Sequence, residues 1–144
     1  MFVLQKEHRR ISLEFTERAI LENFHQTKDV MERLTRDGYR FYLDDFGTGY
    51  SNFNCLLQLP FQFIKLDASL VRREVEGRDP HQTVRTLTSL FRSMGLNVVA
   101  EGAETEAEVE ILRQQGVDRI QGFALARPMP AEALEQVYET HSAV

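Results

Sequence analysis

The chain has 144 residues, of which 42% are hydrophobic, and a formal net charge of −5. This length and composition favour a single domain with one core, so we expect no internal boundary within residues 1–144. The acidic balance and the scattered basic residues argue against a surface that binds duplex nucleic acid. We expect no membrane segment, because no apolar run is long enough to cross a bilayer. The single cysteine, Cys55, is compatible with a reducing compartment, which favours a cytoplasmic location.

Short β-branched or aromatic runs alternate with helical patterns along the chain. The runs predict strands at residues 11–15, 40–43, 63–66, 97–100 and 119–123. After the first strand, one apolar stripe from Ile20 to Leu34 predicts a helix that ends at Asp37-Gly38. Such an order of strands and helices predicts an α/β fold with parallel strands. It is either a doubly wound sheet or part of a (β/α) barrel.

Capping signals mark the later helices. Asp79 followed by Pro80 resembles an N-cap and a first-turn proline, which predicts a helix that continues to Gly95. Thr105 and Glu108 have the spacing of a capping box, and Gly116 stands where that helix should end. A last helix is predicted to start at Pro130.

Polar residues recur at or near the carboxyl end of each predicted strand, which is where parallel α/β folds build their sites. Several carboxylates packed together raise one another's pKa unless a cation neutralises them, and oxygen ligands suit a hard ion such as Mg²⁺ or Mn²⁺. Metal ions with a lysine and an amide would support phosphodiester hydrolysis. The residues concerned are Glu14, Glu17, Asp44, Asp45, Lys65, Asp67, Glu101, Glu104 and Gln121.

Five ordered motifs contain these residues. They are LEFTE at 13–17, LDDFGTGYS at 43–51, IKLD at 64–67, VAEGAET at 99–105 and QGF at 121–123. In order and spacing they resemble the EAL-domain cyclic di-GMP phosphodiesterases, which open cyclic di-GMP to linear pGpG in bacterial second-messenger signalling. The resemblance implies a TIM-type barrel fold, of which this chain would form about five parallel strands with covering helices.

The resemblance also implies a role for each motif position. Metal ligands for Mg²⁺ or Mn²⁺, two ions in the complete family site, would be Glu14, Asp44, Asp45 and Asp67. Catalytic groups would be Lys65, Glu101 and Gln121. Support for the substrate or for the loop after the aspartate pair would come from Glu17, Thr48 and Glu104.

A complete (β/α)₈ domain needs about 250 residues, so 144 residues would correspond to the carboxyl-terminal portion of an EAL domain. The Glu-Ala-Leu motif that names the family, whose glutamate is a metal ligand, belongs to the first half of the domain and is not found ahead of the first predicted strand. Whether the chain is an enzyme by itself is therefore left open. It could be active once a homodimer or another chain completes the barrel, a catalytically silent module that binds a nucleotide or a protein, or a non-functional remnant.

Overall fold

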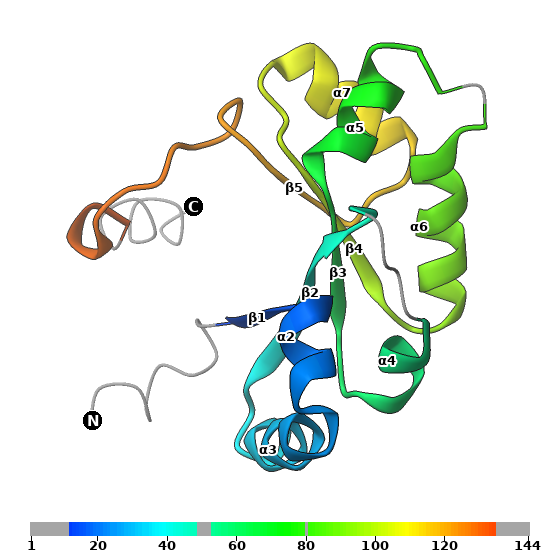
Figure 1. Cartoon of the computed structure of the whole chain (residues 1–144). Helices are drawn as coiled ribbons and strands as arrows, with labels where there is room; N and C mark the ends of the chain where they lie inside the picture. The colour runs from blue at the N-terminus through cyan, green and yellow to red at the C-terminus, as the bar shows by residue number, and fades with distance from the viewer. Residues whose placement is uncertain (1–11, 49–52, 80, 135–144) are drawn as a thin grey trace.

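The structure, a computed structural model, describes residues 12–48, 53–79 and 81–134 (Figure 1). Within these residues the strands form one five-stranded sheet in the order β1-β2-β3-β4-β5, and every neighbouring pair is parallel. The predicted parallel α/β fold is therefore confirmed. The strands are β1 (Ser12–Thr16), β2 (Arg40–Phe46), β3 (Phe63–Leu66), β4 (Asn97–Glu101) and β5 (Arg119–Gln121).

Strand ends differ from the prediction in ways that matter for the site. β2 continues through Asp44 and Asp45 to Phe46, and β4 includes Glu101, so these carboxylates belong to the strands themselves. β5 ends at Gln121, two residues earlier than predicted.

Helices connect successive strands. They are α2 (Glu17–Glu22), α3 (Phe24–Arg36), α4 (Phe53–Gln58), α5 (Ala68–Val75), α6 (Thr83–Ser93) and α7 (Glu106–Gln114). The capping box of α7 is confirmed, because the Thr105 and Glu108 side chains each accept a backbone N–H of the other residue. Ala131–Leu134 are helical, as predicted from Pro130.

Two helix predictions were wrong. The stripe from Ile20 to Leu34 forms two helices rather than one, because the backbone at Asn23 leaves the helical region between α2 and α3. α6 begins at Thr83 instead of next to Asp79. The carboxylate of Asp79 accepts the N–H groups of His81 and Thr83, so it stabilises the turn that leads into the helix. Pro80 lies outside the described residues.

The two faces of the sheet bury different side chains, because successive residues of a strand point to opposite faces. Phe41, Leu43, Ile64 and Leu66 belong to the main core, which also contains helix residues such as Phe91. Their neighbours on the opposite face form a second, smaller cluster, which consists of Tyr42, Phe63 and Val99. This opposite face is called the inner face below, and it carries the polar groups described next.

After β5 the chain extends away from the helices that cover the sheet (Figure 1). This segment exposes four large apolar side chains among the described residues, namely Phe123, Leu125, Met129 and Leu134. Among the described helices, none has the length and hydropathy needed to cross a bilayer.

Candidate active site

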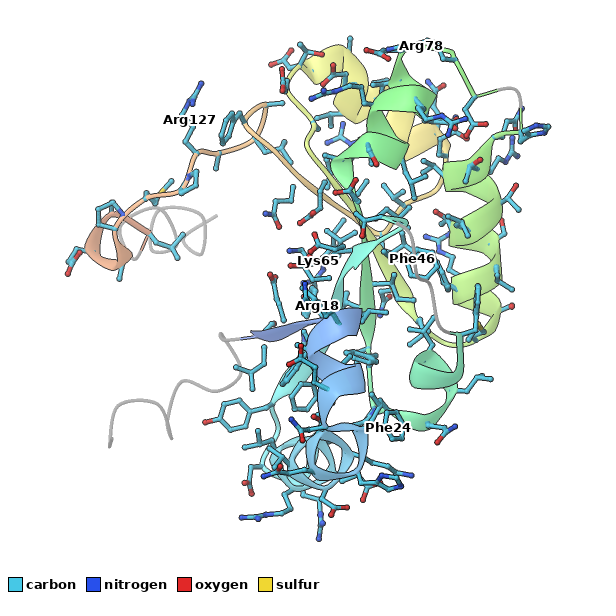
Figure 2. All side chains as sticks on the ribbon, viewed as in Figure 1. Arg18, Phe24, Phe46, Lys65, Arg78 and Arg127 are labelled. Carbon is cyan, nitrogen blue, oxygen red and sulfur yellow. The ribbon has the colours of Figure 1, made fainter. Side chains whose placement is uncertain are left out.

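Lys65 is the centre of a charged network on the inner face (Figure 2). Its side chain is only 5% exposed, and its ammonium nitrogen lies 2.8 Å from Glu14 Oε2, 3.0 Å from Asp44 Oδ1 and 2.7 Å from Glu101 Oε1. The three carboxylates come from β1, β2 and β4, which surround β3 in the sheet. Carboxylates from distant parts of the sequence thus lie around one ammonium group, as expected from motifs at the carboxyl ends of parallel strands.

The protonation state of this network follows from its surroundings. Burial disfavours the charged form of Lys65, but the hydrogen bonds with Glu101, Glu14 and Asp44 outweigh it and raise the pKa of the lysine. Burial raises the pKa of Glu101, and the negative charges of Asp44 and Glu14 act in the same direction against the attraction of Lys65. Lys65 therefore stays protonated at neutral pH, while the surroundings of Glu101 disfavour its charged form.

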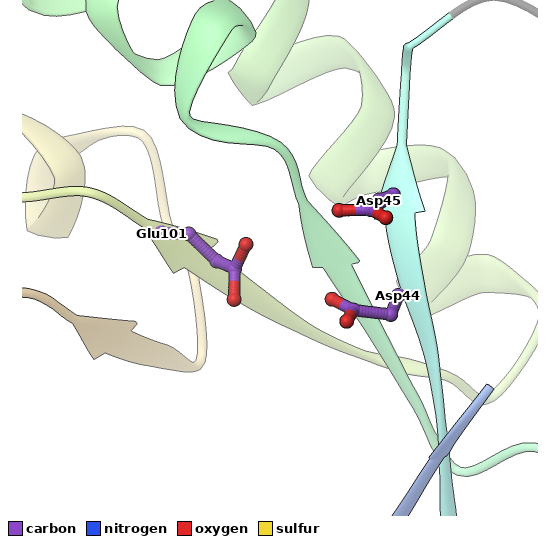
Figure 3. Close-up of side chains that lie close together, drawn as sticks. All are labelled: Asp44, Asp45 and Glu101. Carbon is purple, nitrogen blue, oxygen red and sulfur yellow. The ribbon is translucent and has the colours of Figure 1, made fainter. Parts of the chain in front are cut away.

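Asp44, Asp45 and Glu101 form a second grouping around the same point (Figure 3). One carboxylate oxygen from each residue lies within 4.8 Å of the others, a spacing that a single metal ion could bridge. The pairing of β2 with β3 shifts register between Leu43 and Phe46, and Asp45 has a positive φ of 58°. This irregularity lets two adjacent aspartates approach the same point, although neighbours in a regular strand face opposite sides.

The turn after the aspartate pair requires a glycine. Gly47 has a φ of 108°, and a Cβ atom built there would lie 2.3 Å from Leu70 Cδ1. Another residue would be strained at this positive φ, and the Leu70 side chain of α5 would have to move away from its Cβ.

The donor set fits a hard divalent cation. Glu14, Asp44, Asp45 and Glu101 are four carboxylates around one ammonium group, so the network carries an excess of negative charge. Oxygen ligands of this kind bind Mg²⁺, Mn²⁺ or Ca²⁺ in preference to softer metals.

Some predicted site residues lie outside this network. The carboxylate of Asp67 accepts the N–H of Ser69 at 2.8 Å and caps α5. The Thr48 hydroxyl donates to the carbonyl oxygen of Asp45 at 3.1 Å, which agrees with a supporting role in the loop. Glu104 is exposed, and its nearest basic partner is Arg72 at 4.0 Å. The side chain of Glu17 is not among those described.

Gln121 ends β5, where it pairs in register with Glu101. It lines two pockets of about 260 and 680 Å³. The smaller pocket also contains Glu101 and Glu104, and the larger one also contains Glu14. Gln121 therefore lies where an occupant of either pocket could reach the carboxylates.

Sequence reasoning missed a layer of residues directly below the charged network. The rings of Tyr42 and Phe63 are stacked with centroids 4.3 Å apart, and the Arg119 guanidinium lies 4.4 Å from the centre of the Phe63 ring. Arg119 Nη1 also donates to the Tyr42 hydroxyl at 2.8 Å. The two-residue period of a strand could have revealed these residues. Each of them precedes a predicted site residue by two positions and therefore lies on the same face of its strand.

Comparisons with known proteins identify the family of the chain. The model of the EAL domain family matches residues 3–128. The cyclic di-GMP phosphodiesterase PdeR of Escherichia coli is 36% identical over 138 residues, which cover 96% of this chain and 21% of PdeR. MucR of Pseudomonas aeruginosa, a bifunctional diguanylate cyclase and cyclic di-GMP phosphodiesterase, is 38% identical over 128 residues, or 89% of this chain and 19% of MucR.

Solved structures give the same result. The MucR phosphodiesterase in complex with c-di-GMP superposes with a TM-score of 0.77 at 38% identity, covering 89% of this chain and 52% of that one. A manganese and cyclic di-GMP complex of Klebsiella pneumoniae BlrP1 has a TM-score of 0.67 at 34% identity, and the match covers 81% of this chain and 30% of that one. The fold is thus part of the TIM-barrel-like EAL fold. The chain spans about a fifth of the length of these curated relatives, and it belongs to the EAL domain family.

Proposed function

We propose that this chain supplies the metal-binding and lysine-bearing portion of a cyclic di-GMP phosphodiesterase site, which hydrolyses cyclic di-GMP to linear pGpG. The observation that carries the proposal is the convergence of Asp44, Asp45 and Glu101 on one point beside the buried Lys65. The relatives named above support the substrate class, because their names and complexes refer to cyclic di-GMP.

The proposed metal ligands are Glu14, Asp44, Asp45 and Asp67, and the proposed ions are Mg²⁺ or Mn²⁺, two in a complete site. Such ions would activate a water molecule and offset negative charge on the phosphate. The carboxylate of Asp67 accepts the N–H of Ser69 at the start of α5. A carboxylate has further lone pairs, so this hydrogen bond is compatible with a ligand role.

Lys65 has a different role in the proposal. Because its pKa is raised, the side chain stays protonated near neutral pH, so it serves as a positive charge rather than as an acid or a base. It would hold Glu101 and Asp44 in place and stabilise negative charge on a phosphate oxygen. Glu101 would act as a ligand or as the base for the attacking water, with Gln121 binding that water from β5.

Further residues support this arrangement in the proposal. Thr48 stabilises the turn after the aspartate pair. Glu17 supports the same loop, and Glu104 contributes at the edge of the smaller pocket, which it lines.

We also propose that the sheet is completed by a homodimer partner or by another chain. β1 and β5 are the outer strands of the described sheet, and such strands offer unpaired backbone groups. A cytoplasmic location is proposed from the single cysteine and from the intracellular nature of a second messenger.

The test is hydrolysis of cyclic di-GMP by the purified chain with Mn²⁺ or Mg²⁺, with the linear product separated by chromatography and the mass in solution measured on the same sample. Glu101→Gln should abolish turnover, because it removes the buried charge but keeps the shape. Glu110→Gln, an exposed change on α7, is the matched control and should retain full turnover. Absence of turnover in a folded sample, or equal turnover by Glu101→Gln, would contradict the proposal.

A further inference from the structure

The inner face of the sheet is built in two layers that repeat on four strands. Tyr42, Phe63, Val99 and Arg119 form the lower layer, and the residues two positions later are Asp44, Lys65, Glu101 and Gln121. A step of two residues keeps the same face and moves about 7 Å along a strand. On each strand the upper-layer group therefore follows its lower-layer neighbour on the same face. Contacts between side chains define the lower layer, since the β3–β4 ladder itself pairs Lys65 with Val99.

β5 is the least supported strand of this sheet. It has three residues, it is an outer strand, and it pairs only with β4 among the described strands. Several contacts hold β5 and the preceding Asp118 close to β4. The Asp118 N–H donates to the Val98 carbonyl oxygen at 3.0 Å, and the Val98 N–H donates to the Asp118 carboxylate at 2.8 Å. Beyond the strand, the Ala103 N–H donates to the Gln121 carbonyl oxygen at 3.3 Å, and Gly122 packs so closely that a Cβ there would lie 2.0 Å from the Ala103 carbonyl oxygen. These contacts fix β5 to its neighbour but not to β2 or β3.

Arg119 makes the connection across β4. Its backbone pairs in register with Val99 of β4, yet its guanidinium reaches Phe63 of β3 and the hydroxyl of Tyr42 of β2. A planar guanidinium can stack on a ring while it donates a hydrogen bond in its own plane, which an ammonium group does less well. The side chain therefore joins three strands at the level directly below the charged network.

We propose that Arg119 is a positioning residue, which holds Gln121 in register with Lys65 and the carboxylates by tying β5 to the Tyr42–Phe63 pair. The role in turnover rests on the proposed phosphodiesterase function, whereas the role in placing Gln121 does not. Arg119 has an exposed side, so it is not needed to fill the core, and its contacts account for its place on the inner face.

The test uses Arg119→Met, which keeps most of the side-chain volume, and Arg119→Lys, which keeps the charge. Tyr42→Phe removes only the acceptor of the hydrogen bond. Arg113→Met is the matched control, because Arg113 is an exposed arginine of α7 whose ion-pair partner among the described residues is Glu110 of the same helix. All are made in the full chain, and folding is checked by circular dichroism.

The first readout does not need activity. In Arg119→Met the amide protons of β5 should exchange about tenfold faster relative to those of β3, the factor expected from losing a charge-assisted hydrogen bond and a cation–π contact. The side-chain NH₂ signals of Gln121, assigned through Gln121→Glu, should shift. Arg119→Lys should give an intermediate result, Tyr42→Phe a smaller change in the same direction, and the double variant less than the sum of the two. Unchanged β5 exchange and unchanged Gln121 signals would overturn the proposal.

The second readout is turnover of cyclic di-GMP at saturating Mn²⁺. Misplacing one group of a site by about 1 Å can lower kcat by about 100-fold, so Arg119→Met should lower kcat by about 10-fold to 100-fold with little change in KM. Normal kcat in a variant whose Gln121 signals have shifted would overturn the link to catalysis. If the unaltered chain shows no turnover, the proposed function fails, and the exchange and Gln121 signals still decide the role of Arg119. If Arg119→Met does not fold, Tyr42→Phe provides the same comparisons.

Discussion

Replacing Lys65 by methionine should destabilise the fold, because the lysine offsets the electrostatic repulsion between the carboxylates around it. The ammonium group lies 2.7–3.0 Å from three carboxylates and is only 5% exposed, and methionine fills a similar volume without charge. In Lys65→Met, Glu14, Asp44, Asp45 and Glu101 would face one another with no protein cation between them. We therefore expect a less stable fold at neutral pH and a stronger response to divalent cations.

The magnitude follows from burial. Removing one member of a fully buried ion pair costs about 3–5 kcal/mol. Here the Glu14 side chain is 45% exposed, so water can screen part of the repulsion. We expect a loss of about 2–3 kcal/mol, which corresponds to a urea midpoint about 1 M lower for a slope of about 2 kcal/mol/M.

The assay is urea unfolding of the unaltered chain, Lys65→Met and the control Lys28→Met, which changes a lysine that is 39% exposed and 3.9 Å from Glu32. Because the pKa of Lys65 is raised in the fold, its contribution is complete at neutral pH and would be lost only as pH rises through that raised pKa. The difference between the two proteins should shrink near pH 3, where carboxylates are largely protonated. Mn²⁺ should stabilise Lys65→Met more than the unaltered chain. Equal midpoints at pH 7 with an equal response to Mn²⁺ would refute the reasoning.

Three further changes test other parts of the fold. Gly122→Ala should cost about 3 kcal/mol or disorder β5, because the new Cβ would overlap the Ala103 backbone; a urea midpoint within error of the unaltered chain would contradict that packing. Burial would raise the pKa of Asp118, but the hydrogen bonds from Arg92 and from the Val98 N–H lower it. The ionised carboxylate therefore stabilises the fold above its unfolded pKa, and this contribution is lost as pH falls through the lowered pKa. Asp118→Asn should therefore be less stable by about 1 kcal/mol at pH 7 and equal to the unaltered chain near pH 2, as measured by thermal unfolding. Thr105→Ala should cost about 1 kcal/mol through loss of the capping box, and faster amide exchange confined to the first turn of α7 would confirm it.

Strand patterns and motif spacing predicted much of the architecture. The alternation of residues 63–66 and 97–100 with helical stripes was enough for a parallel sheet, because such periods reflect which side chains are buried. The convergence of Glu14, Asp44, Lys65 and Glu101 was also predictable, since parallel strands bring their carboxyl ends to one edge.

The features that the sequence did not predict depend on contacts that the period of apolar residues does not encode. The sequence did not predict α4 and α5, which are short. The N-cap of α5 is Asp67, which the motif had suggested only as a metal ligand. Asp67 illustrates the ambiguity, because an aspartate before a helix is equally suited to a cap and to a ligand. The break at Asn23 was not visible either, because the apolar stripe continues through it.

The layered inner face gives a physical reason for placing so many charges on one short sheet. The lower layer is closed by stacked rings and Val99, each less than 8% exposed, so the strands carry a rigid apolar support below the polar groups. The carboxylates then stand at the strand ends, where they keep access to water or to a cation while their backbones remain in the ladder. Moving any of them two positions back would replace a packed apolar side chain by a carboxylate and would remove the ring contacts that now hold the Arg119 guanidinium. The strand period thus ties the positions of Asp44, Lys65 and Glu101 to the apolar residues that precede them by two positions.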